Sequence, residues 1–348
     1  MDDILNRTTF IDFIGLVETE HYSHTKTIAH LAICLDIFTV ILNLILICII
    51  ASNRKLYQQT AYLQVINTCI SNILNGLFVY PLSIYSELEV WNLSQFVCHA
   101  WIMMDVYLPF VNILIFVFIT VERIVLMSAV SRYSKRTRIF AVIELLAPWI
   151  IGILIIFPIW IEGAIAMPDD LGVCLVHLNQ DAALLSPILT YFIPAWMCVV
   201  LTIVVVITIM RSDRPHINNN LPNTDSRNHT NSTRTTYDNK DMLSLASLSF
   251  TNYFYLILWL PHQFITVLLV FCFSCNPPYQ VLIGITWLGA MSSMLCPLAW
   301  FTDKNIRTTT KQLFLSCKCR RTHSAISNVD SNEIELLDSY ERSTSVEI

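Results

Sequence analysis

The sequence predicts an all-α membrane protein built as a seven-transmembrane helix bundle. Of its 348 residues, 55% are hydrophobic and only 14% are charged, against roughly 25% charged in a soluble domain. Seven apolar runs each have the ~20 residues that a helix needs to cross a bilayer. They lie near 30–51, 62–84, 99–121, 139–161, 183–210, 243–273 and 279–303. Strand-like alternation is missing, which argues against a membrane barrel.

The same composition excludes several classes of function. A mean hydropathy of +0.57 does not suit a soluble enzyme. The net charge of −5 gives no basic face for nucleic acid. The residues form no complete catalytic or metal-ligand set, so we expect neither an enzyme nor a bound cofactor or metal.

The basic residues predict the orientation in the membrane. Of the 21 Lys and Arg, all but Arg7 and Lys26 fall on one side, in the loops after spans 1, 3 and 5 and in the tail. Cytoplasmic loops carry this excess, so the odd number of spans places the N-terminus outside. We therefore expect a multi-pass plasma-membrane protein with an extracellular segment 1–29. The sequon at Asn6 is the preferred glycosylation site, over the membrane-proximal Asn92.

Four of the eleven cysteines are predicted to form disulfides. Cys98 begins span 3 on the outer side, and Cys174 lies in the outer loop between spans 4 and 5. That compartment is oxidising, and these two form its obvious long-range pair. Cys272 and Cys275 lie at the outer end of span 6. Zinc would need four ligands, so we prefer a small loop disulfide there.

Charged residues within the spans are candidates for function, because burying them in a membrane is costly. Asp105 lies about 10 Å inward from Cys98 along the helix. It is either a counter-ion for a cationic ligand or a carboxyl that is protonated or bonded to its neighbours. Arg123 lies on the same helix face at the inner end, as a functional residue or an ordinary cytoplasmic anchor. Glu122 and Asp241 are its candidate ionic partners.

Three amides, Asn43, Asn72 and Asn112, are predicted to lie inside spans 1, 2 and 3. Buried amides need hydrogen-bond partners, so we expect an interhelical network.

Taken together, the spans, Cys98, Asp105 and Arg123 resemble a rhodopsin-like (class A) G-protein-coupled receptor over residues 30–316. Further landmarks are Asn43, Pro81, Trp91, Trp101, the Glu122-Arg123-Ile124 motif, Trp149, Pro158, Pro194, Trp259-Leu260-Pro261 and Pro297. The resemblance implies a receptor domain over 30–303, with loop 211–240 disordered. It also implies a short amphipathic, membrane-parallel helix over 304–316 and a cytoplasmic tail over 317–348. It assigns the activation switch to Glu122, Arg123, Asp241, Pro261, Pro297 and Trp300.

Asp105, Trp287 and Gly289 resemble the aminergic branch of this family. Several segments, among them Phe271-Cys272-Phe273-Ser274-Cys275, are similar to muscarinic acetylcholine receptors. The implied ligand-binding residues are Asp105, Trp101, Val106, Ser186, Thr190, Trp259, His262, Gln263, Thr286 and Trp287. Acetylcholine is the first prediction, with a heterotrimeric G protein as partner.

Departures from the family pattern keep the ligand open. The tyrosines that surround acetylcholine in muscarinic receptors are replaced by Val106, His262, Thr286 and Ala290. Ser186 and Thr190 share one face of span 5, as hydroxyls do in monoamine receptors, although helix-backbone bonding is the alternative. Histamine or another monoamine is therefore the second prediction, and a channel or transporter is the alternative from a different class.

One further departure concerns sodium, and the rest of the predictions concern the tail. Asn72 replaces the family's sodium-binding aspartate, so we expect no sodium regulation. Cys317 and Cys319 beside the membrane suit palmitoylation by contact with membrane lipid. The hydroxyls near Ser345 are expected to recruit arrestin when phosphorylated. The end at Ile348 suits a PDZ scaffold.

Overall fold

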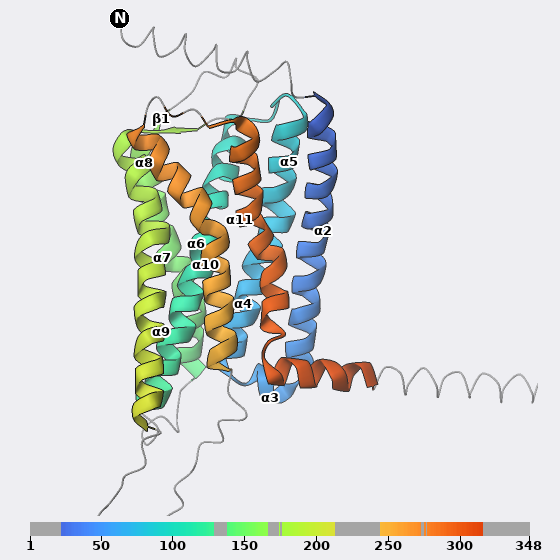
Figure 1. The fold of residues 1–348 in the computed structure, drawn as a ribbon, viewed down its shortest axis with the longest axis vertical. Coiled ribbons are helices and arrows are strands. Elements are labelled where there is room, and N and C mark those ends of the chain that lie inside the picture. The colour runs from blue at the N-terminus through green and yellow to red at the C-terminus, as the bar shows by residue number, and fades with distance from the viewer. Residues whose placement is uncertain are drawn as a thin grey trace, which may run out of the picture.

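The protein is a bundle of long helices that run side by side, as a computed structural model shows (Figure 1). The structure describes residues 22–128, 138–165, 174, 176–212, 244–272, 275 and 277–315. The first half contains α2 (Tyr22–Ser52), α3 (Arg54–Tyr57), α4 (Thr60–Leu74), η1 (Asn75–Val79), α5 (Tyr80–Leu88) and α6 (Gln95–Ser128). The second half contains α7 (Arg138–Gly163), β1 (Ala164–Ile165), β2 (His177–Leu178), α8 (Gln180–Pro187), η3 (Ile188–Phe192), α9 (Ile193–Ser212), α10 (Leu245–Phe271) and α11 (Tyr279–Trp300).

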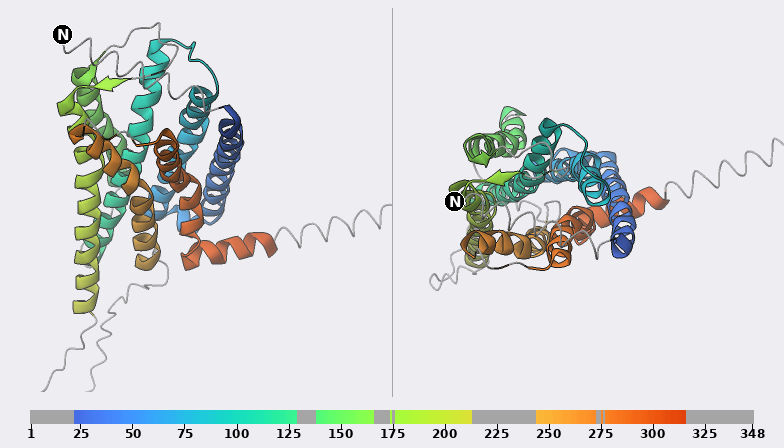
Figure 2. Two further views of the ribbon diagram at one scale, coloured as in Figure 1. Left: turned by 45° about the horizontal axis from the view of Figure 1, so that its top comes forward. Right: turned by 90° about the horizontal axis from the view of Figure 1, so that it is seen from above.

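The prediction of seven spans is confirmed within the described residues. The candidate spans are Ala29–Ser52, Thr60–Leu88, Gln95–Val125, Ala141–Gly163, Gln180–Thr208, Ala246–Phe271 and Gln280–Trp300. Helices satisfy every backbone hydrogen bond internally, as a spanning segment in lipid requires. Seen from above, the helices stand in a ring, with α7 on the outer side of α6 (Figure 2). A further helix over 304–315 turns away beneath α11.

Two of the spans contain a wide π-helical turn that the sequence analysis did not foresee. The turn η1 precedes Pro81, and η3 precedes Pro194. A proline ring clashes with the carbonyl four residues earlier and cannot donate a hydrogen bond. Those carbonyls belong to Leu77 and Thr190, inside the two π turns. A π bulge widens the helix at such a point, and such bulges occur often at functional sites.

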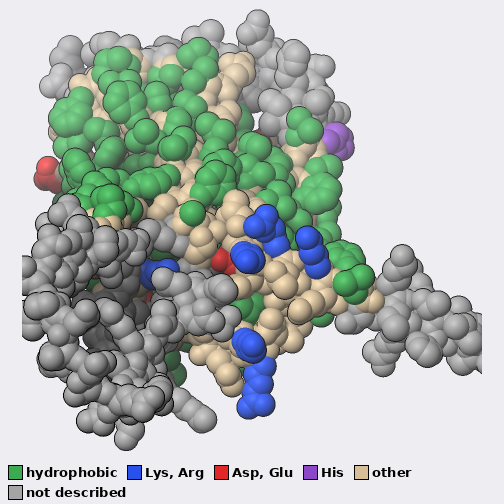
Figure 3. Space-filling view, turned by 60° about the horizontal axis from the view of Figure 1, so that its bottom comes forward, with side chains coloured by type: hydrophobic (Ala, Val, Ile, Leu, Met, Phe, Trp, Pro, Cys, Tyr) green, Lys and Arg blue, Asp and Glu red, His purple; other side chains and the backbone are tan. Residues whose placement is uncertain are grey.

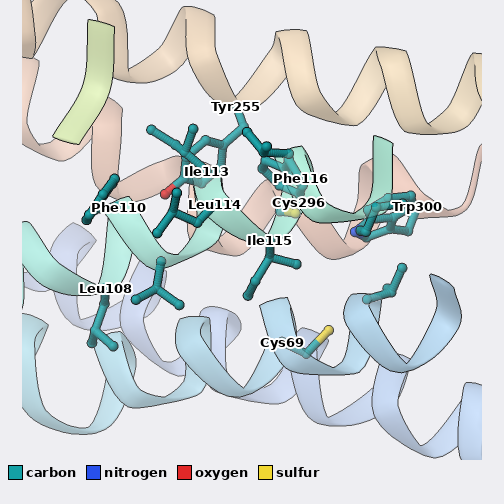
Figure 4. Packing of buried hydrophobic residues seen from close by; sticks show 14 of the residues in the cluster. Cys69, Leu108, Phe110, Ile113, Leu114, Ile115, Phe116, Tyr255, Cys296 and Trp300 are labelled. Carbon is teal, nitrogen blue, oxygen red and sulfur yellow. The ribbon is translucent and has the colours of Figure 1, made fainter. Parts of the chain in front are cut away.

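The bundle has a continuous core around α6, into which side chains of the neighbouring helices pack (Figure 4). Phe116 of α6 meets Tyr255 of α10 edge to face, with ring centroids 5.3 Å apart. Trp300 at the inner end of α11 is fully buried. The outward faces carry large exposed hydrophobics, among them Leu154, Trp196 and Ile257. Exposed apolar side chains all around the bundle suit a surface that faces lipid.

Basic side chains gather at one end of the molecule, around the helix that follows α11 (Figure 3). The exposed ones that the structure describes there are Arg54, Lys55, Lys304, Arg307 and Lys311. Above them the described surface is mainly hydrophobic (Figure 3). This end is predicted from the sequence to be cytoplasmic, and on that prediction it is called the inner end and the opposite one the outer end.

Candidate amine-binding site

Two disulfides tie down the outer end of the bundle. Cys98, at the start of α6, is bonded to Cys174, with their Cα atoms 5.5 Å apart. Cys272 and Cys275 form the second bond, just after α10. Both predicted pairs are confirmed. The first one joins segments separated by 76 residues and so holds the loop after β1 at the outer end of α6.

Asp105 lies on α6, two helical turns below Cys98. In the part of the chain that the structure describes, no group donates a hydrogen bond to its carboxylate. Its one recorded interaction there is electrostatic, with Tyr80 of α5. The seven spans contain a single Lys or Arg, Arg123, which lies at the far end of α6. The described residues therefore supply Asp105 with no counter-ion.

Two of the predicted aromatic site residues, Trp101 and Trp259, are held by contacts with other side chains. Trp101 stacks on Trp91, with ring centroids 5.4 Å apart. Trp259 meets His262 edge to face at 5.6 Å and donates its indole N–H to Ser292 Oγ at 2.9 Å. The 5% exposed indole of Trp259 is therefore fixed from two sides.

Trp287 connects α11 to α5 near the outer end. Its ring lies 6.0 Å from Tyr80, and its indole N–H donates to Glu87 Oε1 of α5 at 3.2 Å. The Tyr80 hydroxyl donates to Ser293 Oγ at 2.9 Å. Neither Tyr80 nor Glu87 was predicted from the sequence. Glu87 lies beyond the predicted run 62–84 but inside the observed span Thr60–Leu88, so a longer predicted span would have marked it as an ionisable residue in the membrane. Nothing in the sequence distinguishes Tyr80.

Some of the predicted polar site residues already form hydrogen bonds, and others form none with the described residues. The Thr190 hydroxyl donates to the backbone carbonyl of Ser186 at 2.8 Å, and Thr286 likewise bonds the carbonyl of Leu282. Of the pair Ser186 and Thr190, Thr190 thus follows the helix-backbone alternative. His262 Nδ1 is buried without a hydrogen-bond partner among the described residues. Half-buried Ser186 and Gln263 make no recorded side-chain bond there, and half-buried Val106 packs on the core.

The predicted amide network is confirmed below the level of Asp105. Asn72 donates to Asn43 Oδ1 at 3.1 Å, and Asn112 donates to Asn72 Oδ1 at 2.9 Å. Asn43 in turn donates to the carbonyl of Ser293 on α11 at 2.9 Å. The chain of amides joins α2, α4, α6 and α11. It contains no carboxylate, so it does not fit the sodium ion that the family pattern places beside an aspartate.

The predicted switch residues lie toward the inner end. Glu122 is buried, and Arg123 interacts electrostatically with Tyr62, Glu122 and Asp303. Pro261 and Pro297 lie inside α10 and α11. Neither Tyr62 nor Asp303 was predicted from the sequence. Asp303 is the last residue of the predicted run 279–303, whereas the observed span ends at Trp300.

Several predicted features lie outside the described residues. They are glycosylation at Asn6, the Asp241 partner of Arg123, palmitoylation at Cys317 and Cys319, the predicted loop 211–240 beyond residue 212, and the tail beyond 315. Residues 211 and 212 of the loop predicted to be disordered continue α9. Helix α2 begins at Tyr22, inside the segment 1–29 that was predicted to precede the first span.

A family model described as the 7 transmembrane receptor (rhodopsin family) matches residues 42–300. The chain belongs to this family. The family is one of receptors and not of enzymes. The seven apolar helices among the described residues make the protein a multi-pass membrane protein.

Individual relatives of the receptor share less than a third of its residues. The chain is 28% identical to 5-hydroxytryptamine receptor 1E of Pan troglodytes over 47% of its own length and 46% of the relative's. It is 24% identical to octopamine receptor beta-2R of Chilo suppressalis over 85% of its own length and 82% of the relative's. It is 22% identical to a D(2)-like dopamine receptor of Takifugu rubripes over 58% of its own length and 43% of the relative's. The receptor thus aligns with only about half the length of the first of these.

Proposed function

We propose that the receptor binds a small monoamine through Asp105 and, in response, activates a heterotrimeric G protein. The observation that carries the proposal is a carboxylate on α6 that receives no hydrogen bond and no counter-ion from the described residues. A half-buried carboxylate inside a membrane span is costly unless a partner arrives. A protonated amine supplies that partner as an ion pair with charge-assisted hydrogen bonds.

A monoamine fits the surrounding residues better than acetylcholine does. A quaternary ammonium has no N–H to donate and is held mainly by aromatic faces. Val106, Thr286 and Ala290 supply none. By contrast, His262 Nδ1 is buried without a partner among the described residues, and Ser186 carries an uncommitted hydroxyl. These groups could bond a ring hydroxyl or ring nitrogen of the ligand. The named relatives are receptors for serotonin, octopamine and dopamine, which supports the same choice.

The signal would pass from the amine site to the inner end through α10. Trp259 lies one helical turn from His262 and two residues before Pro261, where the helix lacks a backbone hydrogen bond. Movement of α10 about this point would open a cytoplasmic cleft for the G protein. With the basic end in the cytoplasm, the N-terminus lies outside the cell and the receptor belongs in the plasma membrane.

The test is an amine panel on cells that express the receptor, with serotonin, octopamine, dopamine, histamine and acetylcholine and generic G-protein readouts. Asp105→Asn keeps the side-chain shape but removes the charge. Removing one partner of a buried ion pair costs about 3–5 kcal/mol, or roughly a hundred- to several-thousandfold in potency.

The matched control is Asp181→Asn, the same change on the exposed first turn of α8. It should leave potency unchanged, and surface labelling should show equal amounts of both variants. Unaltered potency in Asp105→Asn would overturn the proposal. Acetylcholine as the sole active amine would refute the choice of a monoamine.

A further inference from the structure

One buried carboxylate at the inner end of the bundle joins three segments that are distant in sequence. Asp303 is 1% exposed and lies just after α11. Its Oδ1 accepts hydrogen bonds from the backbone N–H groups of Asn305 at 2.9 Å and Ile306 at 3.2 Å. These are the bonds of an N-cap. The same residue thus starts the helix over 304–315.

The carboxylate also bonds two spans. Oδ1 accepts from the Tyr62 hydroxyl of α4 at 3.1 Å, and that hydroxyl accepts from the Asn305 side chain at 2.9 Å. Oδ2 accepts from the backbone N–H of Ser244 at 3.0 Å. Ser244 is the N-cap of α10 and therefore its innermost described residue. Arg123 interacts electrostatically with both Asp303 and Tyr62.

The bond to Ser244 is the part of this arrangement that a moving α10 must break. The capping hydrogen bonds from Asn305 and Ile306 to Asp303 lie within the start of the helix over 304–315 and do not involve α10. Ile306 is also fully buried. Asn53 of the neighbouring segment also donates to Thr309 at 2.8 Å. That helix is thus held independently of α10. A hydrogen bond from N–H to carboxylate is lost when its atoms separate by more than a few tenths of an ångström beyond about 3.2 Å.

We propose that Asp303 is a positioning residue that holds the inner end of α10 against α4 and the helix over 304–315, and so keeps the G-protein cleft closed without ligand. The inference rests on the proposed function, because it concerns how the same receptor is kept inactive. It differs from the predicted Asp241–Arg123 pair in using a backbone donor on α10 and a carboxylate beyond α11.

The donor can be removed without changing any charge. Ser244 has φ −63° and ψ 129°, and proline fixes φ at about −65°. Ser244→Pro therefore fits the φ of the existing backbone and deletes the N–H together with the hydroxyl. Its side chain makes no capping bond, so Ser244→Ala is a control that keeps the N–H. Asp303→Asn keeps an oxygen for the cap, because Asn also caps helices well, but removes the charge and one acceptor.

The experiment measures nucleotide exchange on G protein by the full-length receptor in membranes without ligand. Losing a hydrogen bond to a charged group shifts a two-state equilibrium by roughly tenfold or more. Ser244→Pro and Asp303→Asn should each raise basal exchange several-fold, with amine potency rising alongside and the maximal response unchanged. Ser244→Ala should match wild type. In the double variant Ser244→Pro/Asp303→Asn, the effects should not add, because both remove one interaction.

A merely structural role for Asp303 would lower surface amount and maximal response together. Equal basal exchange in Ser244→Pro and Ser244→Ala, or full additivity in the double variant, would overturn the proposal. An environment-sensitive fluorophore on Ala246→Cys, corrected for labelling of the unsubstituted receptor, follows the inner end of α10 without any G protein. If no amine activates the receptor but the fluorescence of this label still changes in Ser244→Pro, the proposed function fails while the role of the Asp303–Ser244 bond stands.

Discussion

Gly289 of α11 lies against the ring of Trp259, and adding one methyl group there tests the packing of the amine site. A Cβ at position 289 would lie 2.9 Å from Trp259 Cε3 and 3.1 Å from Cδ2 and Cζ3. These distances are shorter than carbon atoms tolerate, so the indole must shift. The indole is buried, and its N–H is bonded to Ser292 Oγ. Overpacking of this kind costs typically about 1–3 kcal/mol.

Gly284→Ala is the matched control on the same helix. A Cβ there meets nothing within 4 Å. Both substitutions gain roughly 1 kcal/mol of helix propensity, so their difference isolates the overpacking. At about 2–4 °C per kcal/mol, Gly289→Ala should melt roughly 2–12 °C below Gly284→Ala.

The assay is thermal unfolding of the purified receptor in detergent at one scan rate, because membrane receptors often unfold irreversibly. Amine affinity should also fall in Gly289→Ala, because Trp259 lies beside His262 in the proposed site. Melting temperatures that agree within about 1 °C would show that Trp259 does not pack on Gly289 as the structure has it.

Three further outcomes are expected. Amine potency should be the same in sodium chloride and in an organic-cation chloride of equal ionic strength, because Asn72 binds its neighbours through amides alone; a tenfold difference would contradict this. Cys98→Ser should lower the melting temperature, since opening a loop with a separation of 76 residues loses about 4 kcal/mol; peptide mapping without reduction should show Cys98 linked to Cys174, and free thiols would refute the pairing. Asn67→Leu should cost about 1–3 kcal/mol, because the Trp149 indole N–H donates to Asn67 Oδ1 at 2.8 Å; an unchanged melting temperature would show that this bond contributes nothing.

Much of the fold follows from the sequence because lipid restricts the backbone so strongly. A run of ~20 apolar residues can cross the bilayer only as a helix that satisfies its own hydrogen bonds. The positions of the seven spans therefore needed no knowledge of their neighbours. The Cys98–Cys174 pair and the network of Asn43, Asn72 and Asn112 were predicted for a similar reason. An outer-side thiol or a buried amide must find a partner, and few candidates were present.

Only the tertiary structure decided which partner each polar group has. The helical period placed Ser186 and Thr190 on one face, but packing decided that the Thr190 hydroxyl bonds its own helix. The helical period does not predict the contact between Glu87 and Trp287, which are 200 residues apart. Nor could it show that Asp303, at the end of the last predicted run, is buried and bonded to Tyr62 and Ser244. These contacts depend on how the helices rotate and cross, which side-chain packing across the whole bundle determines.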